Sequence, residues 1–118
     1  MLSFPAAVRI YVAVGVTDMR KSFDGLCAAT QSVLREDPFS GHVFAFCNRR
    51  RDRIKLLLWD RSGFWVFAKR LEEGTFAWPE GRDAGEALQV TTKELLCVLE
   101  GIDLRDARTR KRMTRLPT

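Results

Sequence analysis

The chain has 118 residues, of which 46% are hydrophobic and 30% charged, as expected for one globular domain with its own core. No apolar run approaches the length of a membrane-spanning helix, and Arg9 interrupts the apolar N-terminal stretch, so we expect neither a membrane span nor a signal peptide. Three scattered cysteines and one histidine argue against a disulfide framework or a zinc site, and favour a cytoplasmic protein without cofactors.

The net charge of +5 is concentrated in two places. Residues 103–118 contain six basic and two acidic residues, and residues 49–55 contain five basic residues and one acidic residue. Such clusters suit a polyanion better than evenly spread charge does. The alternative is that these bases only keep the protein soluble. We expect residues 1–102 to form a single globular domain and residues 103–118 to form a flexible basic tail.

The first part of the chain is predicted to form a strand followed by a long helix. Residues 8–14 are β-branched and aromatic, which is typical of a strand. Apolar residues, Met19 and Phe23 among them, then recur at helical spacing and predict a helix over residues 18–36 whose apolar side packs on the sheet. Asp18 is a candidate N-cap for this helix, and Pro38 stops it.

A β-hairpin is predicted over residues 53–71, with the sequence RIKLLLWDRSGFWVFAKRL. Aliphatic and aromatic residues fill both arms, and the only glycine, Gly63, lies at the join. A three-residue loop with Gly63 left-handed in a bulge suits this join. Residues 43–47 add a preceding strand, so that an antiparallel meander forms with the basic loop 48–52, NRRRD, at one end.

The three-residue loop also predicts which residues of the hairpin face each other. Three pairs of similar residues lie opposite one another in that register: Trp59 and Trp65, Leu57 and Phe67, and Lys55 and Lys69. The other face then carries the aliphatic side chains that we expect to pack on the long helix: Ile54, Leu56, Leu58, Val66 and Ala68. Two opposed lysines are unfavourable. Either their stems cover the aromatic rings while the ammonium groups reach water, or the pair holds an anion such as phosphate.

The last part of the chain is predicted to be a short apolar segment, a loop, a short strand and a short helix. Residues 76–79 are apolar, residues 80–86 are polar and glycine-rich as in a loop, and residues 88–90 suit a strand. Thr91 and Glu94 form a capping box for a final helix that ends at Gly101. The predicted fold class is therefore α+β: an antiparallel β-meander packed under one long helix, with a short C-terminal helix and a basic tail.

Three motifs carry a resemblance to a known family: TDMRKSFDGL at residues 17–26, DPFSGHVFAFCNRRRDRIKLLLWDRSGFWVFAKRLEEGTFAWP at residues 37–79, and LLCVLEGIDL at residues 95–104. Together they resemble the accessory protein, often labelled TnpB or Orf2-like, of bacterial transposable elements of the insertion-sequence-66 type. The resemblance implies a protein encoded beside a separate transposase that carries Asp-Asp-Glu chemistry. DNA binding and assistance to that transposase are the tasks usually suggested for the family.

Three carboxylates near the ends of predicted elements are candidates for metal-dependent chemistry on DNA: Asp18, Asp60 and Glu72. However, a helix cap explains Asp18, and the first position of a turn explains Asp60. One histidine leaves too few bases for a nucleophilic triad, and there is no glycine-rich phosphate loop. We therefore expect no enzyme, no catalytic residues and no bound metal.

The favoured function is a non-catalytic accessory role in DNA transposition, with direct contact to DNA. Basic residues of the loop and its surroundings are the candidate nucleic-acid-binding residues: Arg20, Lys21, Arg49, Arg50, Arg51, Arg53, Lys55, Lys69 and Arg70. The alternative is a module that docks on the element's transposase, or on other element-encoded proteins, without touching DNA. Aromatic residues are the candidate interface in that case: Trp59, Trp65 and Phe67.

Overall fold

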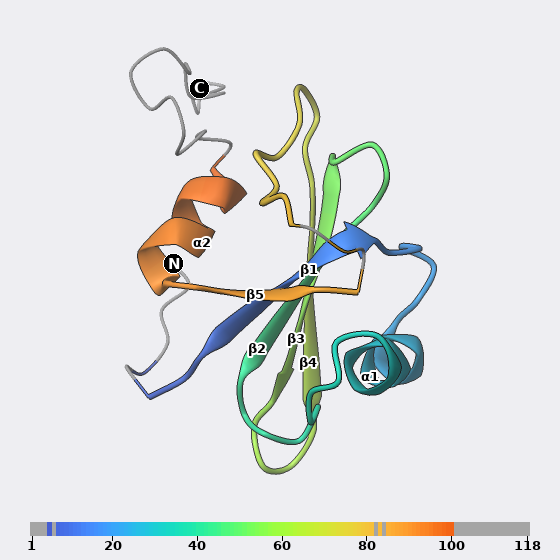
Figure 1. The fold of residues 1–118 in the computed structure, drawn as a ribbon, viewed down its shortest axis with the longest axis vertical. Coiled ribbons are helices and arrows are strands. Elements are labelled where there is room, and N and C mark those ends of the chain that lie inside the picture. Colours follow the sequence, from blue (N-terminus) through green and yellow to red (C-terminus); the bar gives the residue numbers. More distant parts are fainter. Residues whose placement is uncertain (1–4, 6, 82, 84, 101–118) are drawn as a thin grey trace.

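The structure is a computed structural model that describes residues 5, 7–81, 83 and 85–100. Over this part of the chain it forms a five-stranded mixed β-sheet and two short helices, which confirms the α+β class (Figure 1). The elements in chain order are β1 (Ile10–Val16), α1 (Phe23–Ser32), β2 (Val43–Cys47), β3 (Arg53–Trp59), β4 (Phe64–Arg70), β5 (Ala87–Val90) and α2 (Thr92–Leu99). The predicted basic tail, residues 103–118, lies outside the described residues.

The strands lie in the order β4-β3-β2-β1-β5. Strands β2, β3 and β4 form the predicted antiparallel meander, which is confirmed. Strand β1 extends it by pairing in parallel with β2, and β5 pairs antiparallel with β1. A parallel pair needs a crossover connection, and the segment that contains α1 supplies it between β1 and β2.

Each face of the sheet is covered by one helix, and α1 and α2 lie on opposite sides of the strands in Figure 1. On the α1 face, buried residues of the helix region and the sheet form one cluster: Ala13, Leu26, Leu34, Phe44, Phe46 and Leu57. On the α2 face, Leu95, Val98 and Leu99 join the inward side chains of the strands. Phe76 and Trp78, from the segment after β4, complete that second cluster.

The predicted long helix is wrong, because α1 has ten residues and begins at Phe23. Asp18 instead forms a turn: its carboxylate accepts from the backbone N–H of Arg20 at 2.9 Å, and its carbonyl accepts from that of Lys21 at 3.1 Å. An aspartate that bonds its own neighbouring backbone competes with helix formation. The helix also ends early, since Arg35 has a left-handed φ of 58°. By contrast, the predicted capping box of α2 is confirmed.

The predicted register of the hairpin is wrong by one residue. Trp59 faces Phe64, and Lys55 faces Ala68. The connection has four residues, 60–63, and the carboxylate Oδ1 of Asp60 accepts from the backbone N–H groups of Ser62 and Gly63. The positive φ, 85°, falls on Arg61 rather than on Gly63. Because side chains alternate along a strand, this shift places every side chain of β4 on the face of the sheet opposite to the predicted one.

The shift also changes which side chains pack on α1. Leu56 belongs to the α2-face cluster with Leu58 packed against it, whereas Leu57 belongs to the α1-face cluster with Val66 packed against it. The expected packing of Leu56 and Leu58 on α1 is therefore wrong. Phe23, at the start of α1, is 47% exposed and does not take the core position that the helical spacing indicates.

Candidate nucleic-acid interface

The loop between β2 and β3 is held in place by the side chain of Asn48. Its Oδ1 accepts from the backbone N–H of Asp52 at 3.0 Å and from that of Arg53 at 3.1 Å. Its Nδ2 donates to the carboxylate of Asp52 at 2.7 Å. These bonds set the backbone of the loop and leave the side chains of Arg49 and Arg50 exposed.

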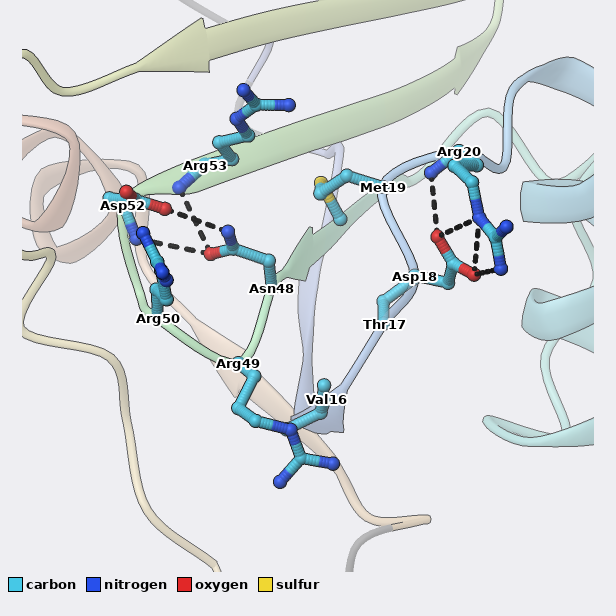
Figure 2. Close-up of a pocket in the computed structure, with 10 residues that line it drawn as sticks. All are labelled: Val16, Thr17, Asp18, Met19, Arg20, Asn48, Arg49, Arg50, Asp52 and Arg53. Carbon is cyan, nitrogen blue, oxygen red and sulfur yellow. Dashed lines mark hydrogen bonds and ion pairs between the residues drawn. The ribbon is translucent and has the colours of Figure 1, made fainter.

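An open hollow of about 520 Å³ lies between this loop and the turn after β1. Figure 2 shows its lining residues, with Met19 between the two segments. One side is lined by Val16, Thr17, Asp18, Met19 and Arg20, and the other by Asn48, Arg49, Arg50, Asp52 and Arg53. Both carboxylates already have partners, because Asp18 pairs with Arg20 and Asp52 accepts from Asn48. The hollow is therefore a cationic one.

A second hollow of about 390 Å³ adjoins the first, and the two share Met19 and Arg53. Arg53, Lys55 and Arg70 lie on the α1 face of the sheet here, as the hairpin register requires. Seven basic residues line the two hollows, and one of them, Lys69, directs its ammonium group away to the carbonyl of Leu99. The other six are called the basic surface below: Arg20, Arg49, Arg50, Arg53, Lys55 and Arg70.

Three arginines of the basic surface form no ion pair with any of the described residues. Within the part of the chain that the structure describes, ion pairs join only Arg20 with Asp18 and Arg70 with Glu72. Arg49, Arg50 and Arg53 are exposed and form none. No acidic side chain of the described residues therefore neutralises these three guanidinium groups.

The Asp18–Arg20 pair forms one wall of the first hollow. The Nη2 atom of Arg20 lies 2.6 Å from Oδ2 of Asp18, and Nε donates to the same carboxylate. The side-chain and backbone hydrogen bonds from Arg20 lower the pKa of Asp18 to about 2. Asp18 is therefore ionised at neutral pH and partly neutralises Arg20, as Glu72 does Arg70.

Arg51 does not join the basic surface, although it lies in the chain between Arg50 and Arg53, which do. Its Nη2 donates to the carbonyl of Val14 at 3.1 Å, and its guanidinium lies 5.9 Å from the ring centre of Trp78. Its Nη1 is buried without a hydrogen-bond partner among the described residues. Burial raises the pKa of the Cys47 thiol, and the Arg51 guanidinium opposes part of that rise. Arg51 thus links the loop to the α2-face core.

The two lysines predicted to face each other lie on opposite faces of the sheet. The Nζ of Lys55 donates to the carbonyl of Lys21 at 2.8 Å on the α1 side. The Nζ of Lys69 donates to the carbonyl of Leu99 at 2.6 Å on the α2 side. The predicted facing of the two lysines is therefore wrong, and neither of the two explanations for such a pair is needed. Lys21 itself lines a separate hollow between β1 and α1.

The candidate interface aromatics are also divided between the two faces. Trp59 packs with Phe39 and Phe64, with ring centres 4.9–5.1 Å apart, on the α1 side. Trp65 stacks on Phe67 at 5.8 Å on the α2 side and is 53% exposed. The indole N–H of Trp65 donates to Asp60, and this bond lowers the pKa of that carboxyl.

Two residues of the site are missed by the sequence-based prediction. The helical spacing assigns Met19 to the predicted helix, whereas in the structure it lines both hollows. Asn48 shapes the loop, and an asparagine at the start of a turn is the signal that points to this role. The three candidate carboxylates do not converge: the described residues contain no group of three or more His, Cys, Asp or Glu that could hold a metal ion.

The fold and this site define a small α+β protein that presents a cationic surface at one end of a mixed sheet. None of the described helices is long and apolar enough to cross a membrane. The chain belongs to the IS66 Orf2-like family, whose match spans residues 8–109. It is thus an Orf2-like accessory protein of IS66 elements, which confirms the resemblance in its motifs.

Two relatives from Sinorhizobium fredii (strain NBRC 101917 / NGR234) are similar to the chain over almost its whole length. "Uncharacterized protein y4hO" is 35% identical over 116 residues, which cover 98% of this chain and 99% of the relative. "Uncharacterized protein y4jC" is 33% identical over 118 residues, which cover 100% of this chain and 97% of the relative. No solved structure matches the chain significantly.

Proposed function

We propose that the protein is a non-catalytic accessory factor of transposition that contacts DNA through the basic surface. The observation that supports this most is the convergence of three separate segments on the two hollows. The turn after β1, the β2–β3 loop and the paired ends of β3 and β4 all contribute cations there. A local run of arginines alone would not require this convergence.

The chemistry of the basic surface suits a phosphate backbone. Arg49, Arg50 and Arg53 each offer a planar guanidinium that can bind a phosphate through two hydrogen bonds. Lys55 and Arg70 extend the cationic surface along the sheet beyond them. Phosphate contacts position a protein on DNA but carry little sequence information. This surface therefore predicts affinity for DNA in general, with element ends as one of its targets.

The experiment is a salt titration of DNA binding by the full chain. Contact with about five phosphates gives a slope of log affinity against log salt near −4.5, so that raising salt from 50 to 200 mM weakens binding about 500-fold. Replacing Arg49, Arg50 and Arg53 with Ala should make the slope shallower by about three and weaken all DNA sequences similarly.

Two matched controls separate this surface from charge in general. The first removes three exposed cations elsewhere, Arg9→Ala, Arg61→Gly and Lys93→Ala, and should leave the slope within about one of the wild type. The second replaces the bases at positions 108, 110, 111 and 112 with Ala in the full-length chain. If the second variant abolishes binding while the loop triple leaves the slope unchanged, the basic surface is not the DNA site.

The alternative function is docking on the transposase of the element without contact to DNA. The exposed Trp65, stacked on Phe67, is the feature that favours it, because exposed aromatics with nearby arginines are typical of protein interfaces. Absence of any DNA shift at moderate salt, together with capture of the transposase that is lost in Trp65→Ala, would favour this alternative.

A further inference from the structure

Among the described residues, strand β4 is a long edge of the sheet with no strand on its outer side. It comprises seven residues, Phe64–Arg70, without proline, glycine or a break in its register with β3. It stands last in the strand order, and no backbone bond to its outer side is made within the described residues. Such an edge offers a row of unpaired N–H and C=O groups that can pair with another strand.

The two ends of the β3–β4 ladder define which backbone groups point outward. The N–H of Asp60 donates to the carbonyl of Gly63 at 3.0 Å, and the N–H of Leu71 donates to that of Asp52 at 2.8 Å. Hydrogen-bonded pairs alternate along an antiparallel ladder, so that residues 65, 67 and 69 bond to β3. The backbone groups that face outward belong to Phe64, Val66, Ala68 and Arg70.

We propose that β4 pairs antiparallel with β4 of a second copy of this chain, centred on Phe67, to give a two-fold symmetric dimer with a continuous sheet. All four outward-facing residues then find a backbone partner. The facing pairs across the junction are Phe67 with Phe67, Val66 with Ala68, Trp65 with Lys69, and Phe64 with Arg70. No other register pairs all seven residues of both strands.

The side chains of β4 are complementary to themselves in this register. The strand has aromatic residues at one end and cations at the other, so that antiparallel pairing places each cation against an aromatic ring rather than against another cation. Charged residues on an edge usually oppose pairing. Here, however, Lys69 is bound to Leu99 and Arg70 to Glu72, which leaves Val66, Phe67 and Ala68 as an uncharged centre.

The symmetry of this junction has a consequence for the basic surface. A two-fold axis between antiparallel neighbours in one sheet is perpendicular to the sheet, so the α1 faces of both copies lie on the same side. The two Arg70 residues would then lie about 20 Å apart along the strand direction, at six residues of about 3.4 Å each. The dimer itself does not depend on the proposed contact with DNA.

The first test measures the mass of the full chain by sedimentation from about 1 to 100 μM, together with circular dichroism to verify folding. Ala68→Pro removes an outward N–H without touching the β3–β4 ladder. It should weaken dimerisation at least tenfold. Two controls should keep the wild-type dimer: Ala68→Val, which retains the N–H, and Gln89→Pro, which places proline at an outward position of the other edge strand, β5. A wild-type chain that stays monomeric throughout overturns the proposal.

The second test does not depend on whether the proline variant folds. Phe67 faces its own copy as a non-hydrogen-bonded pair, whose Cα atoms lie about 4.5 Å apart, within the range of a disulfide. Phe67→Cys should therefore form a covalent dimer on mild oxidation. Trp65→Cys also replaces an aromatic residue of the same face, but its two copies would lie about 14 Å apart. Equal cross-linking of both variants, or of neither, contradicts the register, and pairing with a transposase strand instead would leave the purified chain monomeric.

Discussion

The ammonium group of Lys69 donates a hydrogen bond to the carbonyl oxygen of Leu99, the last residue of α2, at 2.6 Å. A cation at this end of a helix satisfies a free carbonyl and opposes the negative end of the helix dipole. Lys69→Met should therefore lower the free energy of unfolding by about 0.5–1.5 kcal/mol in a urea melt. It should leave the salt slope of DNA binding unchanged. Lys93→Met, in the first turn of α2, is the control and should not destabilise the protein.

Arg51 should behave as a structural residue, unlike its neighbour Arg50. Loss of its bond to the Val14 carbonyl and of its packing on Trp78 should cost about 1–3 kcal/mol in Arg51→Gly. Glycine is preferred to alanine because the backbone φ is 60° at this position, where alanine would add backbone strain to the loss of the side-chain contacts. Arg50→Ala should change stability by less than about 0.5 kcal/mol. If Arg51→Gly and Arg50→Ala are equally stable, the contacts of the Arg51 side chain with the α2-face core do not stabilise the fold.

The hairpin register can be tested by a double-mutant cycle. Leu26 and Leu57 belong to the α1-face cluster, whereas Leu56 belongs to the α2-face cluster. Leu57→Ala should cost about 2–5 kcal/mol by itself and couple with Leu26→Ala by about 0.5 kcal/mol or more. Leu56→Ala should cost a similar amount but add to Leu26→Ala within about 0.5 kcal/mol. Coupling of Leu26→Ala with Leu56→Ala but not with Leu57→Ala in urea melts would support the register predicted from the three-residue loop instead.

The pKa of Asp18 should be about 2, because of its hydrogen bonds from Arg20. A folded-state pKa below the ordinary value means that the pair stabilises the fold above about pH 4. That contribution is lost as the pH falls through the folded-state pKa. An NMR titration of the Asp18 carboxyl carbon measures the midpoint directly. In Arg20→Ala the midpoint should return toward the ordinary aspartate value, and an unchanged midpoint would rule out Arg20 as its cause.

The purified chain should neither cleave nor join DNA in the presence of Mg²⁺ or Mn²⁺. Asp60 is the candidate carboxylate to test, and its side chain is already occupied by the indole of Trp65 and by its own turn. Metal-dependent cleavage by the wild type that disappears in a folded Asp60→Ala variant would overturn the non-catalytic proposal. Asp83→Ala, at an exposed position in the segment before β5, serves as the matched control.

Local sequence patterns are sufficient to predict much of the secondary structure and to identify the family. The β-branched and aromatic runs mark the strands, and Thr91 with Glu94 marks the start of α2, because these signals depend only on near neighbours. The long motifs identify the IS66 Orf2-like family. The bases of the β2–β3 loop also mark a candidate site by themselves, because they are consecutive in the chain.

Tertiary structure decided the length of α1, the hairpin register and the membership of the basic surface. The carboxylate of Asp60 selects a four-residue connection over a three-residue one, and that single residue exchanges the faces of β4. Lys55 and Lys69 are consequently separated by the sheet. Arg51 turns inward because a carbonyl and an indole ring from distant segments lie beneath the loop. No local pattern contains such contacts, since their partners are far away in the chain.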